Sequence, residues 1–218
     1  FIKYKKFFGL NLKIHRPNFL IKFFFDFIEI SYENYNHNDN KKFHYLGLYL
    51  SLLAKLNIKI ETRKHYLPFT PTSKNIFLNK KYLLFHLDRR WDIFPLNVRD
   101  NLKKKIISLS NHNKIIITSN IGSNYFYNFI KKELKNSKNI EFYDEPSLNN
   151  IISLVYFSET CVSSHSGLIV HSAAAFNKKI IDIVNQEIFN ELDRWVPFEV
   201  NYKRYNVKNF LNESFIFA

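Results

Sequence analysis

The residues best suited to chemistry lie in the segment 163–184, which reads Ser-Ser-His-Ser-Gly and then passes into a run of small residues. Ser164 or Ser166 can cap a helix, and Gly167 lets the backbone turn tightly. The alanines at 173–175 predict a thin helix that can lie close to a sheet or a ligand. A helix N-terminus directs N–H groups and a positive dipole end outward, which is how α/β proteins hold phosphate. The segment therefore predicts an anion-binding loop, a helix and a buried strand.

Two histidines lie on either side of the predicted helix start. His165 precedes the glycine, and His171 follows it by about one helical turn, next to Ser172. A single histidine near a helix is more often structural, but two histidines with several serines around one glycine favour binding. The ring of His171 could bond a phosphate or sugar oxygen. Asp182 is unusual inside a strand; it could pair with a neighbouring loop, and its role stays open at this level.

A second polar loop follows the apolar run 82–87 and contains His86, Arg89 and Arg90. Paired guanidinium groups suit bidentate contacts with phosphate, and Trp91 could stack on a base or a sugar. The alternative is a surface salt-bridge cluster with Trp91 packed at a domain boundary. Because the loop directly follows a predicted strand, we favour a binding role.

Two further loops also follow predicted strands. Ser119 and Asn120 could bind a phosphate or simply cap the next helix, and capping is slightly favoured. Asp144 or Glu145 could accept a hydrogen bond from a ribose or a base, whereas Ser147 is well placed as an ordinary helix cap.

An alternation of strands and helices must position these loops. Apolar runs predict strands at 82–87, 114–118, 140–143, 160–163 and 180–184, and helical spacing predicts helices near 98–109, 125–134 and 148–155, with the alanine-rich helix after them. This order favours a parallel sheet with right-handed crossovers and helices on both faces. In such sheets ligands bind beyond the carboxyl ends of the strands, where all four loops lie.

Two regions meet at a proline-containing linker at 66–75. Residues 1–75 are expected to form part of an N-terminal domain, with a loop at 31–42 and a helix at 43–56, and residues 76–218 a C-terminal domain. The chain starts at Phe1 rather than Met, so we expect a fragment whose N-terminal domain is truncated. Charged residues interrupt the most hydrophobic stretch of this region, residues 19–30, so a membrane-spanning helix is not expected.

The composition and the motifs that the sequence lacks limit the kinds of reaction and ligand to be considered. The net charge of +13 is scattered along the chain, which fits either a solvated lysine-rich surface or attraction to an anionic nucleotide, phosphorylated glycolipid or membrane. Cys161 is the only cysteine, so an intrachain disulfide is impossible and a reducing, cytoplasmic compartment is expected. The sequence contains no G-x-G-x-x-G, P-loop or G-x-S-x-G motif, no metal-ligand cluster, and no spacing that supports a Ser-His-Asp triad.

The segment 163–184 resembles glycosyltransferase family 9, the lipopolysaccharide heptosyltransferase-like enzymes, whose signature is about Asp-Ser-Gly-x-x-His-x-Ala-Ala-Ala. Here His165 stands where the family has Asp, and one extra residue separates the glycine from His171. The similarity is closer to divergent relatives with a Ser-x-His-x-Gly form, an Ile-Ile-Asp-Ile strand, a Trp and an Asn-Tyr pair. The resemblance covers about residues 43–210, and the matching residues are Ser163–Gly167, His171, Ala173–Ala175, Ile180–Ile183, Trp195 and Asn201-Tyr202.

The resemblance implies an α/β, GT-B type fold, in which a Rossmann-like C-terminal domain holds a nucleotide-sugar donor. The N-terminal domain would hold the acceptor, a glycolipid or polysaccharide, and the catalytic base, which therefore stays unknown here. Neither a metal nor a cofactor is expected, because such enzymes hold the diphosphate by the helix dipole and side chains. A cytoplasmic enzyme, peripheral at the inner face of the membrane, is expected to act in lipopolysaccharide biosynthesis.

Two alternatives stay open. A sugar-nucleotide epimerase of the same fold would make similar donor contacts but would need its own acid and base. A non-enzymatic basic module binding nucleic acid would cluster lysines and aromatic residues on one face. The scattered lysines and the regular strand–helix order argue against the second alternative.

Overall fold

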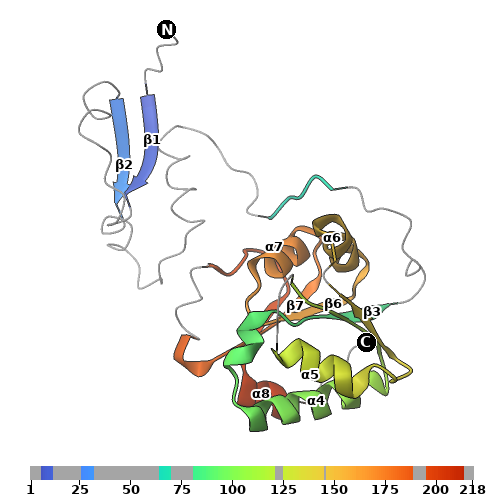
Figure 1. Ribbon diagram of the computed structural model, residues 1–218. Helices are drawn as coiled ribbons and strands as arrows, with labels where there is room; N and C mark the ends of the chain where they lie inside the picture. The colour runs from blue at the N-terminus through green and yellow to red at the C-terminus, as the bar shows by residue number, and fades with distance from the viewer. Residues whose placement is uncertain are drawn as a thin grey trace. The chain divides into compact units, whose positions relative to one another are not determined.

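The computed structural model describes residues 6–11, 26–31, 64–69, 81–120, 125–144, 146–188 and 195–213. Contacts divide the chain into two units, residues 1–62 with 190–196, and residues 63–189 with 197–218. In the first unit, β1 (Lys6–Asn11) and β2 (Asp26–Ser31) pair in parallel (Figure 1). The predicted helix at 43–56 and most of the predicted loop at 31–42 lie outside the described residues. So does most of the linker, and the domain boundary near 66–75 stays a prediction.

The second unit is built on a parallel sheet of six strands in the order β5-β4-β3-β6-β7-β8. The strands are β3 (Tyr82–His86), β4 (Lys114–Thr118), β5 (Ile140–Tyr143), β6 (Thr160–Ser163), β7 (Lys179–Val184) and β8 (Tyr202–Asn206). The first five strands confirm the prediction, and β8 was not predicted. From β3 the chain adds strands on one side, then crosses back and adds β6, β7 and β8 on the other. The order of addition reverses between β3 and β6, so their carboxyl ends mark a topological switch point, where such sheets bind ligands.

Helices cover both faces of this sheet, as predicted (Figure 1). One face carries α4 (Leu96–Ser110), α5 (Tyr125–Leu134) and the short α8 (Val207–Asn212). The other carries α6 (Leu148–Phe157) and α7 (Gly167–Ala175). Short 3-10 helices are η1 (Arg89–Ile93) and η2 (Gln186–Ile188). Within the described part of the chain, no helix is long and apolar enough to cross a membrane.

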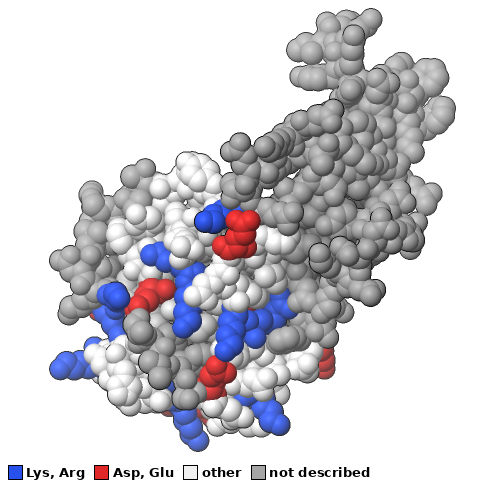
Figure 2. Space-filling view, turned by 180° about the vertical axis from the view of Figure 1, so that it is seen from behind, with Lys and Arg blue, Asp and Glu red and all other residues white. Residues whose placement is uncertain are grey.

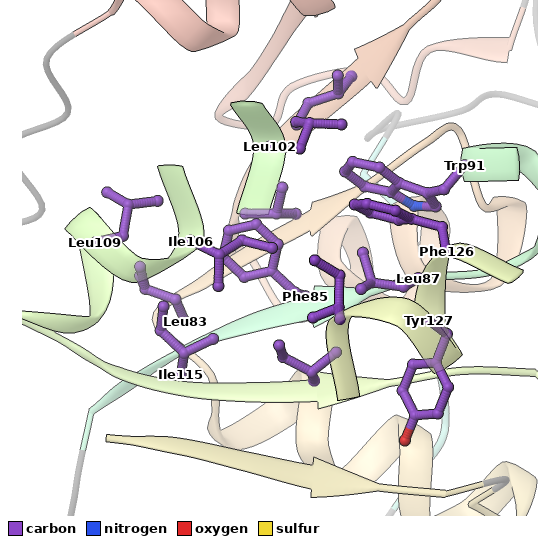
Figure 3. Close-up of a cluster of buried hydrophobic side chains, with 14 of the residues drawn as sticks. Leu83, Phe85, Leu87, Trp91, Leu102, Ile106, Leu109, Ile115, Phe126 and Tyr127 are labelled. Carbon is purple, nitrogen blue, oxygen red and sulfur yellow. The ribbon is translucent and has the colours of Figure 1, made fainter. Parts of the chain in front are cut away.

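Alternate residues of β3 supply two separate cores, because side chains of a strand point to opposite faces in turn. Leu83 and Phe85 pack toward α4 and α5, and Leu84 packs toward α6 and α7. Figure 3 shows the first of these clusters, with Trp91 lying against Phe126.

Trp91 is the first correction to the sequence-based prediction. Its side chain is 0% exposed, its ring stacks on Phe126 with centroids 5.6 Å apart, and Nε1–H donates to the carbonyl oxygen of His86 at 2.9 Å. A fully buried indole that packs into the core cannot stack on a base or a sugar. The ring instead anchors η1 to the end of β3.

Candidate functional site

A row of buried polar side chains crosses the sheet at the carboxyl ends of its strands. His86 of β3 pairs in register with Thr118 of β4 on one side and with Ser163 of β6 on the other, and Ser163 pairs with Asp182 of β7. Laterally paired residues of parallel strands project to the same face, here the face covered by α6 and α7. All four side chains are at most 1% exposed. The apolar core of this face therefore ends in a polar row that spans the switch point.

Asp182 holds the loop that joins β6 to α7. Its Oδ1 accepts the backbone N–H of His165 at 2.5 Å, and its Oδ2 lies 2.7 Å from His165 Nδ1. The hydroxyl of Tyr202 on β8 donates to the same Oδ2 at 2.6 Å. His165 has a φ of 51°, a left-handed conformation that residues other than glycine rarely adopt. Asp182 thus pairs with a neighbouring loop, and its bonds support the turn at His165.

The N-terminus of α7 is open. Ser166 occupies the N-cap position, but its side chain makes no capping hydrogen bond. Gly167, the first helical residue, is exposed, and a Cβ built there would meet nothing within 4 Å. Uncapped N–H groups and the positive end of the helix dipole favour an anion at such a position. Ser164 is buried just before this turn, and Ser172 is buried further along α7.

His171 lies in the second turn of α7 and contacts a residue that was not predicted. Its Nδ1 is 3.1 Å from Nε2 of His65, and the two rings stack with centroids 5.0 Å apart. The ring is half-buried. No sequence signal could have identified His65, since the two histidines lie 106 residues apart.

His86 is buried beneath the switch point. Burial lowers its pKa, an effect that Asp88 and the side chain of Asn120 oppose. Its Nδ1 lies 3.0 Å from Thr118 Oγ1. Among the described residues, His86 Nε2 and its register neighbour Ser163 Oγ lack a hydrogen-bond partner of normal geometry. Buried polar atoms are nearly always bonded to protein or water, so these two atoms mark a polar site under the loop.

The loop after β3 places two arginines at the same edge. Asp88 is buried, caps η1 by accepting the backbone N–H of Arg90 at 2.9 Å, and pairs with the Arg90 guanidinium. Arg89 is exposed. Across the next strand, Ser119 is buried and Asn120 is exposed. The two arginines thus place positive charge on η1, just after β3, the strand that neighbours β6 and its loop to α7.

Asp92 on η1 contributes a cap to α5. The carboxylate of Asp92 on η1 accepts the backbone N–H of Tyr125 at 3.2 Å and that of Phe126 at 2.7 Å. Residues 121–124 lie outside the described part of the chain, so their role stays a prediction.

Asp144 follows the outer strand β5 and is bound by α5. Its carboxylate accepts hydrogen bonds from the Tyr127 hydroxyl and the Lys131 ammonium, and these bonds lower its pKa. Glu145 lies outside the described residues. The α7 loop, His86, Ser119, Asn120 and the two arginines therefore lie at the strand ends near the switch point. Asp144 instead bonds to side chains of α5.

The described ranges contain no group of three or more His, Cys, Asp or Glu residues that could hold a metal ion. The groups at this edge that suit an anion are the N-terminus of α7 and the guanidinium groups of Arg89 and Arg90.

Comparison with known proteins identifies the fold. No family model matches the sequence, and no curated protein matches it. Among solved structures, a family 9 glycosyl transferase from Veillonella parvula matches with a TM-score of 0.58 and 11% identity, over 90% of this chain and 58% of that one. Escherichia coli heptosyltransferase WaaC with ADP-2-deoxy-2-fluoro heptose matches with a TM-score of 0.53 and 18% identity, over 85% and 54%. The UDP-GlcNAc 2-epimerase from Methanocaldococcus jannaschii reaches a TM-score of 0.43 at 17% identity, over 60% and 36%.

These likenesses concern the fold. They confirm the predicted GT-B-like glycosyltransferase fold with a parallel α/β domain. The chain spans little more than half the length of the two transferase structures.

Proposed function

We propose that this chain is the donor-binding part of a GT-B glycosyltransferase that transfers a sugar from a nucleotide-diphosphate donor to a cell-surface polysaccharide or lipopolysaccharide. One observation carries the proposal: the uncapped N-terminus of α7 lies beside an oriented histidine at the switch point of the sheet. The WaaC structure, which shares the fold, contains an ADP-heptose analogue. A diphosphate above Gly167 would meet the first-turn N–H groups of α7.

The residues of this site would act on the leaving group. When the acceptor oxygen attacks the anomeric carbon, the bond from that carbon to the diphosphate breaks and negative charge develops on the nucleotide. The helix N-terminus, with Arg89 and Arg90, would stabilise that charge, which is often a large catalytic contribution. The catalytic base would come from the N-terminal part of the protein. The donor serves as substrate, and we propose neither a cofactor nor a metal.

The surface charge supports an anionic acceptor. Figure 2 shows Lys and Arg side chains spread over one face, with acidic residues among them. A net charge of +13 attracts phosphorylated glycolipids and anionic membrane surfaces over about a Debye length. We therefore propose a cytoplasmic protein that works at the inner face of a membrane.

Protection against thermal unfolding tests the donor site. ADP, UDP and GDP are added separately to the full chain, and at least one is expected to raise the unfolding midpoint by mass action. G167E is expected to abolish this protection, because its carboxylate would occupy the anion position, where a Cβ has open space. N97E places the same charge in the first turn of α4 and is expected to keep the protection.

Three outcomes would overturn the proposal. If no nucleotide protects the chain, or if G167E and N97E are protected equally, the donor-site assignment is wrong. Incubation of a donor without acceptor separates the epimerase alternative, since an epimerised sugar nucleotide would exclude the transferase.

A further inference from the structure

Asp182 contacts both the backbone and the ring of His165, the residue that precedes the N-cap of α7. One carboxylate oxygen accepts the His165 amide N–H, and the other lies 2.7 Å from the His165 ring nitrogen Nδ1. The Asp182 side chain is 0% exposed, whereas 17% of the His165 side chain is exposed. A single buried group therefore fixes both the turn and the ring orientation.

The position of the carboxylate is itself fixed from the other side. Tyr202 donates its hydroxyl hydrogen to Asp182 Oδ2, and Arg204 Nε–H donates to the Tyr202 oxygen at 3.0 Å. Burial, and next the nearby Asp182, raise the pKa of Tyr202, so its hydroxyl stays protonated and remains a donor. A hydrogen-bonded chain thus runs from Arg204 on β8 through Tyr202 and Asp182 to His165.

These linked hydrogen bonds decide which further hydrogen bond the His165 ring can make. An ionised carboxylate only accepts hydrogen bonds, so wherever the ring is neutral its hydrogen must lie on Nδ1 to bond with Asp182. The other nitrogen, Nε2, then carries a lone pair and accepts. Next to an anion-binding helix end, that lone pair suits a donor O–H rather than a phosphate oxygen.

We infer that Asp182 is a positioning residue that holds His165 in the Nδ1–H tautomer, so that His165 Nε2 accepts a hydrogen bond from a hydroxyl group of the nucleotide-sugar donor. The inference rests on the proposed donor site and deepens it. It assigns the diphosphate to the α7 N-terminus and a ribose or sugar hydroxyl to His165.

Nitrogen-15 NMR of histidine-labelled full chain at pH 8 tests the tautomer without any ligand. The His165 signals, identified by their loss in H165Q, are expected to show a protonated Nδ1 and an unprotonated Nε2. In D182N the amide N–H can donate to Nδ1, so the ring is expected to shift to the Nε2–H form. Y202F keeps the carboxylate and is expected to keep the wild-type tautomer. A wild-type ring with its hydrogen on Nε2 overturns the inference, whether or not any variant folds.

Nucleotide affinity supplies the second readout. D182N is expected to weaken binding of the protecting nucleotide or its sugar conjugate by about 2- to 12-fold, the net contribution of one hydrogen bond. D100N, an exposed change on α4, is expected to leave affinity unchanged. Unchanged affinity in D182N overturns the role of His165 while the donor site stands. Absence of any nucleotide binding overturns the donor site, and the tautomer still decides whether Asp182 positions the ring.

Discussion

The alanine-rich face of α7 can be tested by one substitution made at two positions. Ala173 is 0% exposed in the core beneath α7, and Ala175 is half-buried two residues later. A173L adds three carbons to a packed site, and overpacking of this kind costs about 1–3 kcal/mol. A175L makes the same change where the side chain has partial access to solvent. The change in helix propensity from Ala to Leu is well below about 1 kcal/mol at either position, so the difference between the two variants mainly reports burial.

Tryptophan fluorescence during thermal unfolding measures this difference. Trp91 is fully buried against Phe126, and W195F removes the second, partly exposed indole. At about 2–4 °C per kcal/mol for a chain of this size, A173L is expected to lower the midpoint by about 2–12 °C. A175L is expected to lower it by much less. If both variants unfold at the same midpoint, the close approach of α7 to the sheet does not require small residues, and our reasoning is refuted.

Three further predictions concern single side chains. D92A removes a cap that accepts two N–H groups of α5, so it is expected to cost about 0.5–2 kcal/mol in urea unfolding while the exposed D100A costs almost none; equal midpoints would contradict this. Burial raises the pKa of the Cys161 thiol to about 12, so a chromogenic disulfide reagent at pH 8 is expected to label it only after unfolding, and rapid labelling of native protein would refute this. Lys131 and a tyrosine hydroxyl lower the pKa of the largely exposed Asp144, so D144N is expected to cost less than about 1 kcal/mol at pH 7. A lowered pKa contributes its full stability above the unfolded value near 3.9 and loses it as pH falls through the lower value of the folded state, so the cost of D144N should shrink in acid, and a cost that does not fall between pH 7 and pH 2 would contradict the assignment.

The sequence predicted the elements whose apolar residues face a core. Runs such as 114–118 are rich in isoleucine and buried, so they stand out from the polar segments around them. The strand Tyr202–Asn206 does not stand out, because only Tyr205 in it is buried. An outer strand needs few apolar residues, and β8 was missed for that reason.

The site was predictable in position but not in its contacts. The α7 loop could be placed by its glycine and by the strand before it. The partner of Asp182 depends on the register of β6 and β7 and on a left-handed turn at His165, neither of which a sequence pattern specifies. Trp91 was misassigned because a tryptophan after a strand looks the same in sequence whether it turns outward or inward.

The hydrogen bond between Tyr202 and Asp182 lets β8 report whether the site beside His165 is occupied. β8 is the last strand of the described sheet, and one hydroxyl connects it to the loop that precedes α7. Any molecule that restrains His165 must also restrain this connection, and amide hydrogens along β8 should then exchange with solvent more slowly. Occupancy of the site can be followed by deuterium uptake in a strand that the bound molecule need not touch.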